Sequence, residues 1–216
     1  MAELGLAARG GDPHRQADRS RLLARSPGRV WILDFTCVGT LFRSVHVGAV
    51  IDAFSRRVIA IGAVAGEPTA AFTVHLLREA VGEAGIPAWV VTDRGRQFTS
   101  RAFTRALARR GIRRRFGAVG QSGSIALLER FWRSMKSEYA RGLFLYRPLR
   151  RIEADLARYA WWYNAERPHQ GLGNLTPDEI HEGRRRRPPR CPARATLRVS
   201  CLGDDRALPI LRLRAA

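Results

Sequence analysis

The apolar positions in the first half of the chain predict three short β-strands in succession. Residues 30–36 have the apolar run of a buried strand, and residues 41–52 and 57–64 have the pattern of two more. Turn-forming residues at 39–40 and 55–56 separate these runs. The pattern therefore predicts an antiparallel meander, in which each strand lies beside the previous one.

The apolar spacing then changes to that of alternating helices and strands. Thr69 is placed to cap a helix that ends near Gly85, and the short apolar run 89–92 predicts a fourth strand. Ser100 is placed to cap a second helix, which continues through Arg109. These elements could pack on the meander and enlarge it.

Strand and helix signals continue toward the C-terminus. Residues 112–116 form a run of strand length, and glycines make 117–123 a loop. Helical spacing predicts a third helix over 125–139 and a fourth over 149–164. The whole order of elements predicts a mixed α/β domain.

Composition divides the chain into three parts. Residues 1–28 lack periodicity and predict a loosely ordered leader, and residues 29–183 form the main domain. Residues 184–216 begin with a run of Arg and Pro that predicts a basic tether. The tail beyond it alternates at 195–200 and 208–213, which is compatible with a small hairpin.

The charge of the chain indicates a polyanionic partner. Lys and Arg total 38 against 19 acidic residues, which gives a formal net charge of +19 and a pI near 11.6. Nucleic acid is the economical explanation, and an Arg-rich composition inherited from a GC-rich genome is the alternative. Hydrophobic residues make up 45% of the chain, so the charge does not predict general disorder.

The cysteines and the hydropathy pattern narrow the class of protein. Cys37, Cys191 and Cys201 are far apart in the sequence and form no Cys-x-x-Cys pair, so neither a zinc site nor a disulfide framework is predicted. No apolar run approaches the roughly 18 residues that a membrane span needs, and the N-terminal residues have no signal-peptide core. We expect a cytoplasmic protein with no membrane contact.

Three carboxylates stand where carboxylates are unusual. Asp34 lies inside an apolar strand, Asp93 follows another, and Glu129 lies in a helix of otherwise apolar and basic residues. A carboxylate in an apolar strand is costly unless it has a partner, and a metal ion is a good one. Ordinary ion pairing or capping is the competing explanation. Asp52 is the main alternative to these site residues. It precedes a turn, however, and an Asp in that position commonly accepts hydrogen bonds from the backbone amides of the turn.

Several segments resemble the integrase core of insertion-sequence transposases. Thirty-five residues, 94 through 128, separate Asp93 from Glu129, the spacing after which this Asp-Asp-35-Glu superfamily is named. The resemblance covers roughly residues 28–183. The segments that carry it surround Asp34 (31–36), follow the second strand (51–59), surround Asp93 (92–100), begin at Glu129 (129–138) and close the core (163–172 and 176–177).

The resemblance implies a fold and a chemistry. It implies a ribonuclease-H-like fold, a mixed five-stranded sheet flanked by helices, here with a basic C-terminal extension. It also implies a metal-dependent polynucleotidyl transferase that cleaves phosphodiesters and joins DNA strands, with Asp34, Asp93 and Glu129 holding two Mg²⁺ or Mn²⁺ ions. Hard cations about 4 Å apart, held by carboxylates, suit phosphoryl transfer. No Gly-rich phosphate loop indicates ATP.

Basic residues near these motifs are predicted to contact DNA phosphates. Glu129, Arg133 and Lys136 fall at i, i+4 and i+7 and so share one helix face. Phe131, Trp132 and Met135 point elsewhere and are expected in the core. The candidate DNA-binding residues are Arg94, Arg96, Arg113, Arg114, Arg115, Arg133, Lys136, Arg167 and His169.

The chain also departs from the family pattern. Arg94, Arg96 and the segment 124–126 differ from what these transposases usually carry. No helix-turn-helix that could recognise the ends of a mobile element is evident in residues 1–28. We therefore expect a truncated product or one half of a split transposase, with a separate helix-turn-helix protein as partner.

The expected partners and the competing functions follow from the same resemblance. The partners would be the ends of the element, the target DNA and further copies of the chain, in a bacterial, nucleoid-associated setting. A ribonuclease-H-like nuclease that cuts without joining is one alternative. An inactive transposase remnant that acts only as a basic DNA-binding protein is the other.

Overall fold

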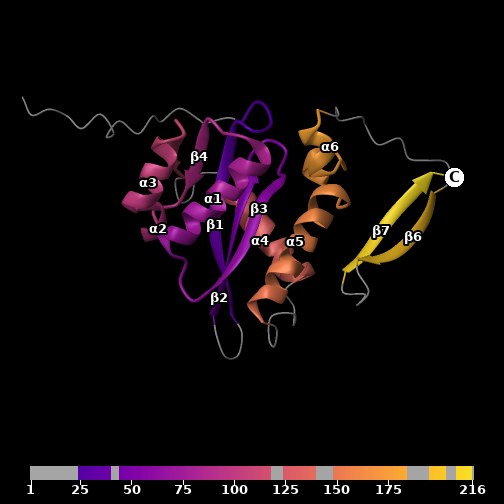
Figure 1. Cartoon of the computed structure of the whole chain (residues 1–216). Coiled ribbons are helices and arrows are strands. Elements are labelled where there is room, and N and C mark those ends of the chain that lie inside the picture. Colours follow the sequence, from indigo (N-terminus) through magenta and orange to yellow (C-terminus); the bar gives the residue numbers. More distant parts are fainter. Residues whose placement is uncertain are drawn as a thin grey trace, which may run out of the picture.

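The computed structural model describes residues 24–39, 44–117, 124–139, 148–183, 195–202 and 208–215. Figure 1 shows a central sheet with helices packed around it. Among these residues, no helix is both long and apolar enough to cross a membrane.

Five strands form the central sheet in the order β3-β2-β1-β4-β5. Strands β1 (Val30–Gly39), β2 (Ser44–Asp52) and β3 (Val58–Ala65) are the antiparallel meander that the sequence predicts. Strands β4 (Trp89–Thr92) and β5 (Arg113–Phe116) add in parallel on the other side of β1. The mixed five-stranded sheet is therefore confirmed.

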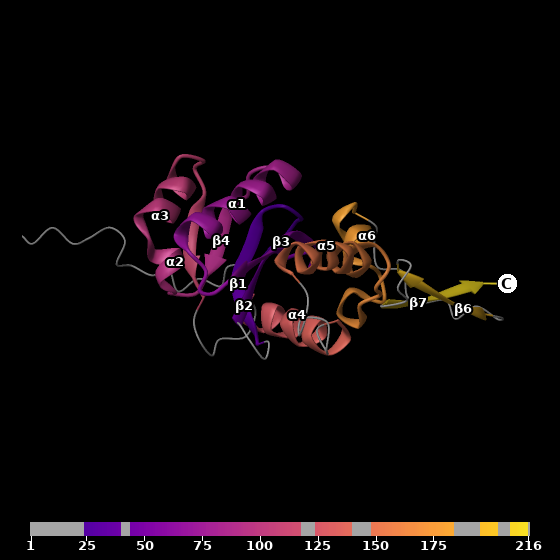
Figure 2. The ribbon, with the colours of Figure 1, turned by 60° about the horizontal axis from the view of Figure 1, so that its bottom comes forward.

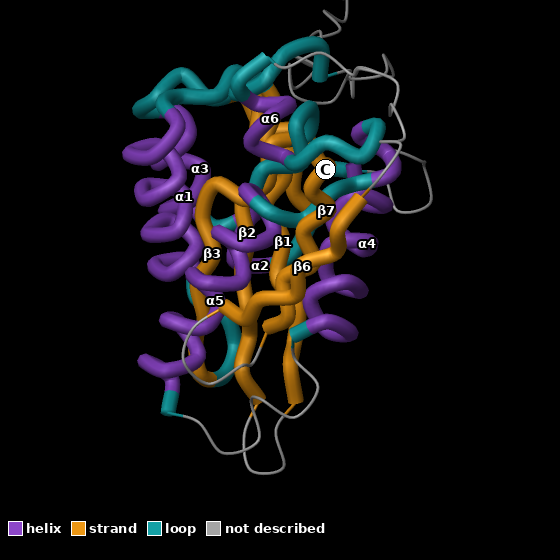
Figure 3. Tube along the Cα trace, turned by 90° about the vertical axis from the view of Figure 1, so that its right-hand side faces the viewer, coloured by secondary structure: helices purple, strands orange, loops and turns teal. Residues whose placement is uncertain are grey.

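Helices cover both faces of this sheet (Figure 2). Helices α1 (Ala70–Ala84), α2 (Arg96–Thr99) and α3 (Arg101–Ala108) lie on one face. Helices α4 (Ser124–Glu138) and α5 (Leu149–Ala165) lie on the other. The side view in Figure 3 shows α1 and α3 on one side of the strands and α4 on the other side.

Alternation along β1 explains the two layers. Trp31 and Leu33 are buried against the α1–α3 layer, whereas Ile32 and Val38 are buried against the α4–α5 layer. Successive side chains on a strand point to opposite faces, so an apolar strand such as β1 needs cover on both sides.

The aromatic residues of α4 and α5 fill the α4–α5 layer. Phe131, Trp132 and Met135 are buried, as the sequence predicts. Their neighbours on α5 include Tyr159 and Tyr163, whose rings lie 6.3 Å and 5.1 Å from that of Phe131. Trp161, also on α5, is 50% exposed and does not belong to this layer.

Some elements were not predicted from the pattern. The short helices α2 and α6 (Pro177–His181) and the 3₁₀ turn η1 (Gln170–Leu172) span too few residues to show a periodic signal. A capping box on Thr176, with Glu179 as its partner, fixes the start of α6. By contrast, the hairpin that the alternation at 195–200 and 208–213 indicated is present, because strands β6 (Ala195–Leu202) and β7 (Leu208–Ala215) pair antiparallel. Most of the predicted leader and the Arg-rich start of the predicted tether lie outside the described residues.

Asn164 ties α5 to the edge strand β3. Its side-chain oxygen accepts from the backbone N–H of Val58 at 2.8 Å, and its amide nitrogen donates to the carbonyl of the same residue at 2.8 Å. Asn164 is 7% exposed and Val58 is 4% exposed, so neither backbone group has easy access to water. The amide thus replaces the missing neighbour strand at this point of the edge.

We expect Asn164→Ala to lower the free energy of unfolding by about 2–4 kcal/mol, because each buried group left without a partner costs about 1–3 kcal/mol. Urea denaturation measures this loss. Glu153→Ala, an exposed substitution on the same helix, serves as the control and should change stability by less than about 0.5 kcal/mol. A loss no larger than the control's would contradict the proposed tie.

Candidate active site

The parallel pairing of β1 and β4 places two of the three predicted carboxylates side by side. Ile32 pairs with Val91; Asp34 lies two residues further along β1, and Asp93 directly follows the last residue of β4. Side chains alternate between faces, so Asp34 is on the same face as Ile32, the face that α4 covers. The carboxyl ends of adjacent parallel strands meet at one edge of the sheet, a usual place for a binding site.

Asp34 is partly buried and is held by α4. The indole Nε1 of Trp132 donates to Oδ2 of Asp34 at 3.1 Å. Burial raises the pKa of Asp34, the hydrogen bonds from Phe35 and Trp132 lower it, and the charges of Asp93 and Glu129 raise it further; the net direction is upward. The sequence analysis expected a partner for the carboxylate of Asp34. One such partner is the indole N–H of Trp132, which the sequence analysis did not predict.

Asp93 and Glu129 complete the acidic group. Both side chains are exposed, and both act on Asp34 through their charge. Oδ1 of Asp93 accepts from the N–H of Gly95 at 2.8 Å, which fixes the turn after β4. Within the part of the chain that the structure describes, no three His, Cys, Asp or Glu side chains are gathered closely enough to form a ready metal cage. The three carboxylates are neighbours in an open arrangement.

Asp52, the rival candidate, has a structural environment. It is fully buried, and its Oδ1 accepts from the backbone of Phe54 and from both the N–H and the hydroxyl of Ser55. Its Oδ2 accepts from the N–H of Gly28 at 2.7 Å. Asp52 thus fixes the turn between β2 and β3 and joins it to the residues before β1.

The predicted basic residues near the carboxylates are accessible. Arg133 and Lys136 are exposed on α4, and Arg94 and Arg96 are exposed just after Asp93. The guanidinium of Arg94 lies 5.4 Å from the centre of the Phe116 ring. These cations flank the acidic group on two elements, where they could hold phosphates.

The three consecutive arginines of β5 differ in their surroundings. Arg113 is exposed over the ring of Trp89, and Arg115 is half-buried. Arg114 donates to the carbonyl of Phe98 at 2.7 Å and to the hydroxyl of Thr104 at 3.1 Å. Its side chain therefore joins β5 to α2 and α3, a structural contact that sequence analysis did not predict.

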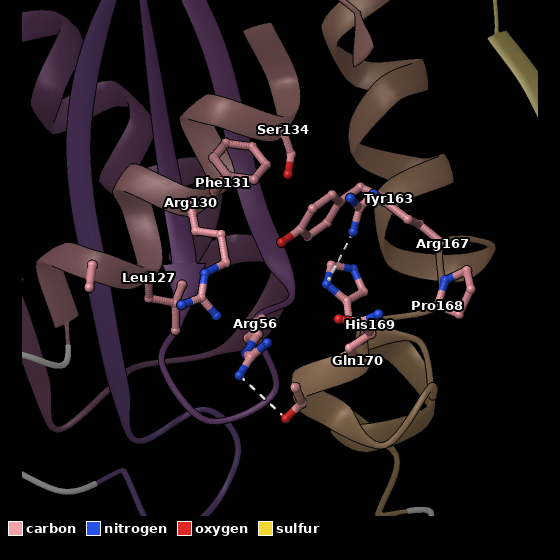
Figure 4. A pocket seen from close by; sticks show the side chains of 12 residues that line it. Arg56, Leu127, Arg130, Phe131, Ser134, Tyr163, Arg167, Pro168, His169 and Gln170 are labelled. Atoms are coloured by element: carbon pink, nitrogen blue, oxygen red, sulfur yellow. Dashed lines mark hydrogen bonds between the residues drawn. The ribbon is translucent and has the colours of Figure 1, made fainter. Parts of the chain in front are cut away.

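Arg167 and His169 lie apart from the carboxylates, in a separate cavity of about 780 Å³ (Figure 4). Nε of Arg167 donates to Oε2 of Glu138 at 3.0 Å, which ties the end of α5 to α4. His169 is 7% exposed. Burial, and then the charges of Arg167 and Arg56, lower the pKa of His169 to about 4.

Sequence analysis missed three residues around these sites. Trp132 was predicted only as core, although its position three residues after Glu129 on a helix could have indicated a place near the site. Arg56 and Arg130 line the cavity with Arg167 and His169. They lie 111 and 37 positions before Arg167 in the sequence, and no local pattern links residues so far apart.

Family models match two overlapping parts of the chain. A model described as integrase core domain matches residues 24–122, and a second with the same description matches residues 110–177. The matched region contains Asp34, Asp93 and Glu129 and also the cavity residues.

The chain is also similar to proteins of bacterial insertion sequences. It is 32% identical over 162 residues to a Mycobacterium tuberculosis protein named as a candidate transposase for insertion sequence element IS986/IS6110, covering 72% of this chain and 58% of the relative. It is 29% identical over 167 residues to the transposase for insertion sequence element IS629 of Shigella sonnei, covering 75% of this chain and 54% of the relative. The chain thus spans little more than half the length of either protein.

Solved structures with a similar fold include retroviral integrases. The catalytic core domain of HTLV-2 integrase, in a complex with magnesium, has a TM-score of 0.56 at 20% identity and covers 73% of this chain and 98% of its own. The simian T-cell lymphotropic virus intasome has a TM-score of 0.62 at 20% identity, covering 89% of this chain and 66% of that chain. The expected ribonuclease-H-like class of fold is confirmed, and residues 24–177 of this chain belong to the integrase core domain family, in the form that insertion-sequence transposases carry.

Proposed function

We propose that this chain is the catalytic core of a DNA transposase, which cleaves phosphodiesters and joins DNA strands with the help of divalent metal ions. The observation that carries the proposal is that Asp34 of β1, Asp93 after β4 and Glu129 of α4 are near enough to one another for the charges of Asp93 and Glu129 to act on Asp34. The match to the integrase core domain and the insertion-sequence relatives supports the same activity.

The three carboxylates fit Mg²⁺ or Mn²⁺ as ligands. Hard divalent cations prefer oxygen donors, and each of these three side chains provides carboxylate oxygens. Burial raises the pKa of Asp34 most, and the negative charges of Asp93 and Glu129 raise it further; a cation would offset these charges, so the acidic group is chemically suited to bind one. When bound, two such ions would stabilise the attacking and leaving oxygens of a phosphodiester.

The residues of the chain would hold the reacting groups in place. A water molecule or a DNA 3′-hydroxyl would attack the phosphorus, lose its proton and displace the oxygen on the opposite side. Trp132 would keep Asp34 oriented through the indole N–H, and the exposed Arg133, Lys136, Arg94 and Arg96 would bind the DNA backbone. None of these steps needs a covalent bond between protein and DNA.

The same proposal extends to partners and to domain organisation. Element ends and target DNA would be the substrates, and further copies of the chain would bring two ends together. Residues 29–183 would be the catalytic core and residues 184–216 a basic extension that adds DNA affinity. A separate helix-turn-helix protein would recognise the element ends. The matched region covers only 58% and 54% of the two relatives named above, so each relative also has residues outside that region.

We expect Asp34→Asn, Asp93→Asn and Glu129→Gln each to lower strand cleavage and joining by about a thousandfold or more, because each removes a charged metal ligand worth several kcal/mol in the transition state. The assay uses labelled DNA ends and a supercoiled target with Mn²⁺, and DNA binding is measured in parallel. Glu153→Gln, an exposed carboxylate on α5, is the matched control.

The outcomes of this assay separate the candidate functions. The proposal is supported if the wild-type protein joins DNA strands and the Glu129→Gln protein does not. Cleavage without joining would identify a nuclease, and salt-sensitive DNA binding without cleavage would identify a chain that needs a partner or has lost its chemistry. Full joining by the Glu129→Gln protein would refute the assigned ligands.

Trp132→Phe tests the positioning role of the indole. We expect about a tenfold lower rate of joining with unchanged DNA affinity, because Phe retains most of the packing but loses the hydrogen bond to Asp34. The Mn²⁺ concentration for half-maximal rate should rise with it. If Trp132 were only a core residue, stability would fall while the metal dependence stayed that of the wild type.

The salt dependence of DNA binding tests the basic residues of α4. Removing one phosphate contact, as in Arg133→Gln, should lower the slope of log affinity against log salt by about 0.9. Arg114→Gln should instead lower stability, because it breaks the contacts with Phe98 and Thr104. An unchanged salt slope in the Arg133→Gln protein would remove Arg133 from the DNA interface.

A further inference from the structure

A cavity lies between α4, the end of α5 and the turn after β2. Leu127, Arg130, Phe131 and Ser134 line it from α4, and Tyr163 lines it from α5. The segment 167–171 and the side chain of Arg56 close the remaining sides. On a helix with 3.6 residues per turn, this side of α4 differs from the side that carries Glu129, Arg133 and Lys136. The cavity is therefore distinct from the acidic group.

His169 brings an unused hydrogen-bonding atom to this cavity. The ring is buried, and its Nδ1 lies 3.4 Å from Nη1 of Arg167. The ring also makes a hydrogen bond with the backbone of Tyr163, so the donor and acceptor roles of its two nitrogens depend on the tautomer. Its Nε2 has no hydrogen-bond partner among the described residues. A buried polar atom without a partner is rare in proteins and calls for a ligand or another explanation.

The side chains around His169 are cationic. Arg56, Arg130 and Arg167 all line the cavity, whereas none of the residues lining it carries a carboxylate. Glu138 pairs with Arg167 from outside the lining, so it offsets part of that charge. Arg130 is exposed on α4, and Arg56 donates to the carbonyl of Gly171 at 3.4 Å. Figure 4 shows Tyr163 and His169 reaching from one wall toward Arg130 and Arg56 on the other.

We propose that this cavity binds a phosphate group, which selects the His169 tautomer protonated on Nε2, accepts a hydrogen bond from that atom and is attracted by the positive charges of Arg130 and Arg56. Several donors converge on a volume of about 780 Å³, which accommodates a phosphate together with the sugars on either side of it. Arginines and neutral N–H donors suit a tetrahedral anion with several acceptor oxygens. The source is a DNA backbone phosphate if the proposed function is correct, and free phosphate otherwise.

Thermal unfolding in inorganic phosphate, compared with chloride at the same ionic strength, tests the cavity itself. Phosphate should raise the midpoint of the wild type by about 2–4 °C when the site is nearly saturated. Arg130→Gln removes an exposed charge without disturbing the core, and His169→Phe removes the donor. Both should lose most of the phosphate-specific rise, with phosphate affinity at least about tenfold weaker.

Arg150→Gln is the matched control, because Arg150 is an exposed arginine at the opposite end of α5. It should respond to phosphate as the wild type does. Phosphate also stabilises proteins generally by exclusion from their surface, and that effect would be equal in every variant. A rise of the same size in all four proteins would overturn the proposal.

A second arm identifies the source of the phosphate in the Glu129→Gln protein, which cannot process DNA if the proposed function holds. Loss of the phosphate-specific rise at saturating DNA means that a DNA phosphate occupies the cavity. Persistence of the rise with DNA bound elsewhere means that the cavity takes free phosphate. Both results support a phosphate site. A phosphate response without any joining would count against the proposed function alone, and joining without a phosphate response would count against the cavity alone.

Discussion

The parallel pairing of β1 with β4 is the constraint on which the acidic site depends. The register that sets Ile32 beside Val91 also brings Asp34 level with Asp93, and a shift by one residue would turn one carboxylate to the other face of the sheet. The apolar residues of both strands hold this register, because they are buried between two helical layers. The packing of the apolar residues in β1 and β4 thus sets the relative position of Asp34 and Asp93 at the end of these strands.

Helix α4 then determines what faces that pair of aspartates. Leu128, Phe131 and Met135 anchor it in the core, and Trp132 reaches Asp34 from the same helix. With these positions fixed, Glu129 can add its charge to the acidic group, while Arg130 turns toward the cavity that His169 lines. Helix α4 therefore contributes Glu129 to the acidic group on one of its sides and Arg130 to the cationic cavity on another.

The sheet could be predicted from the sequence, because the apolar runs of its strands are local signals. The spacing between Asp93 and Glu129 indicated the family, whereas the role of the three carboxylates as metal ligands stays a prediction. The hydrogen bond from Trp132 to Asp34 spans 98 positions and the contact between Arg56 and Gly171 spans 115, so neither leaves a local pattern. Arg114 was predicted only as a DNA contact, and its hydrogen bonds with Phe98 and Thr104, which no local pattern indicates, show that it also holds β5 to α2 and α3.

Charges of like sign act on one buried group in each of the two clusters. Burial is the main cause that raises the pKa of Asp34, and the negative charges of Asp93 and Glu129 raise it further. Burial likewise lowers the pKa of His169, and the positive charges of Arg167 and Arg56 lower it further. Cations at Asp34 and a phosphate near His169 would each relieve one cluster, and both clusters draw residues from α4. Because the same rigid helix carries Glu129 and Arg130, a phosphate held in the cavity would also steady the helix that presents the third carboxylate. The two ligands would then bind cooperatively, so metal affinity would depend on whether DNA is in place.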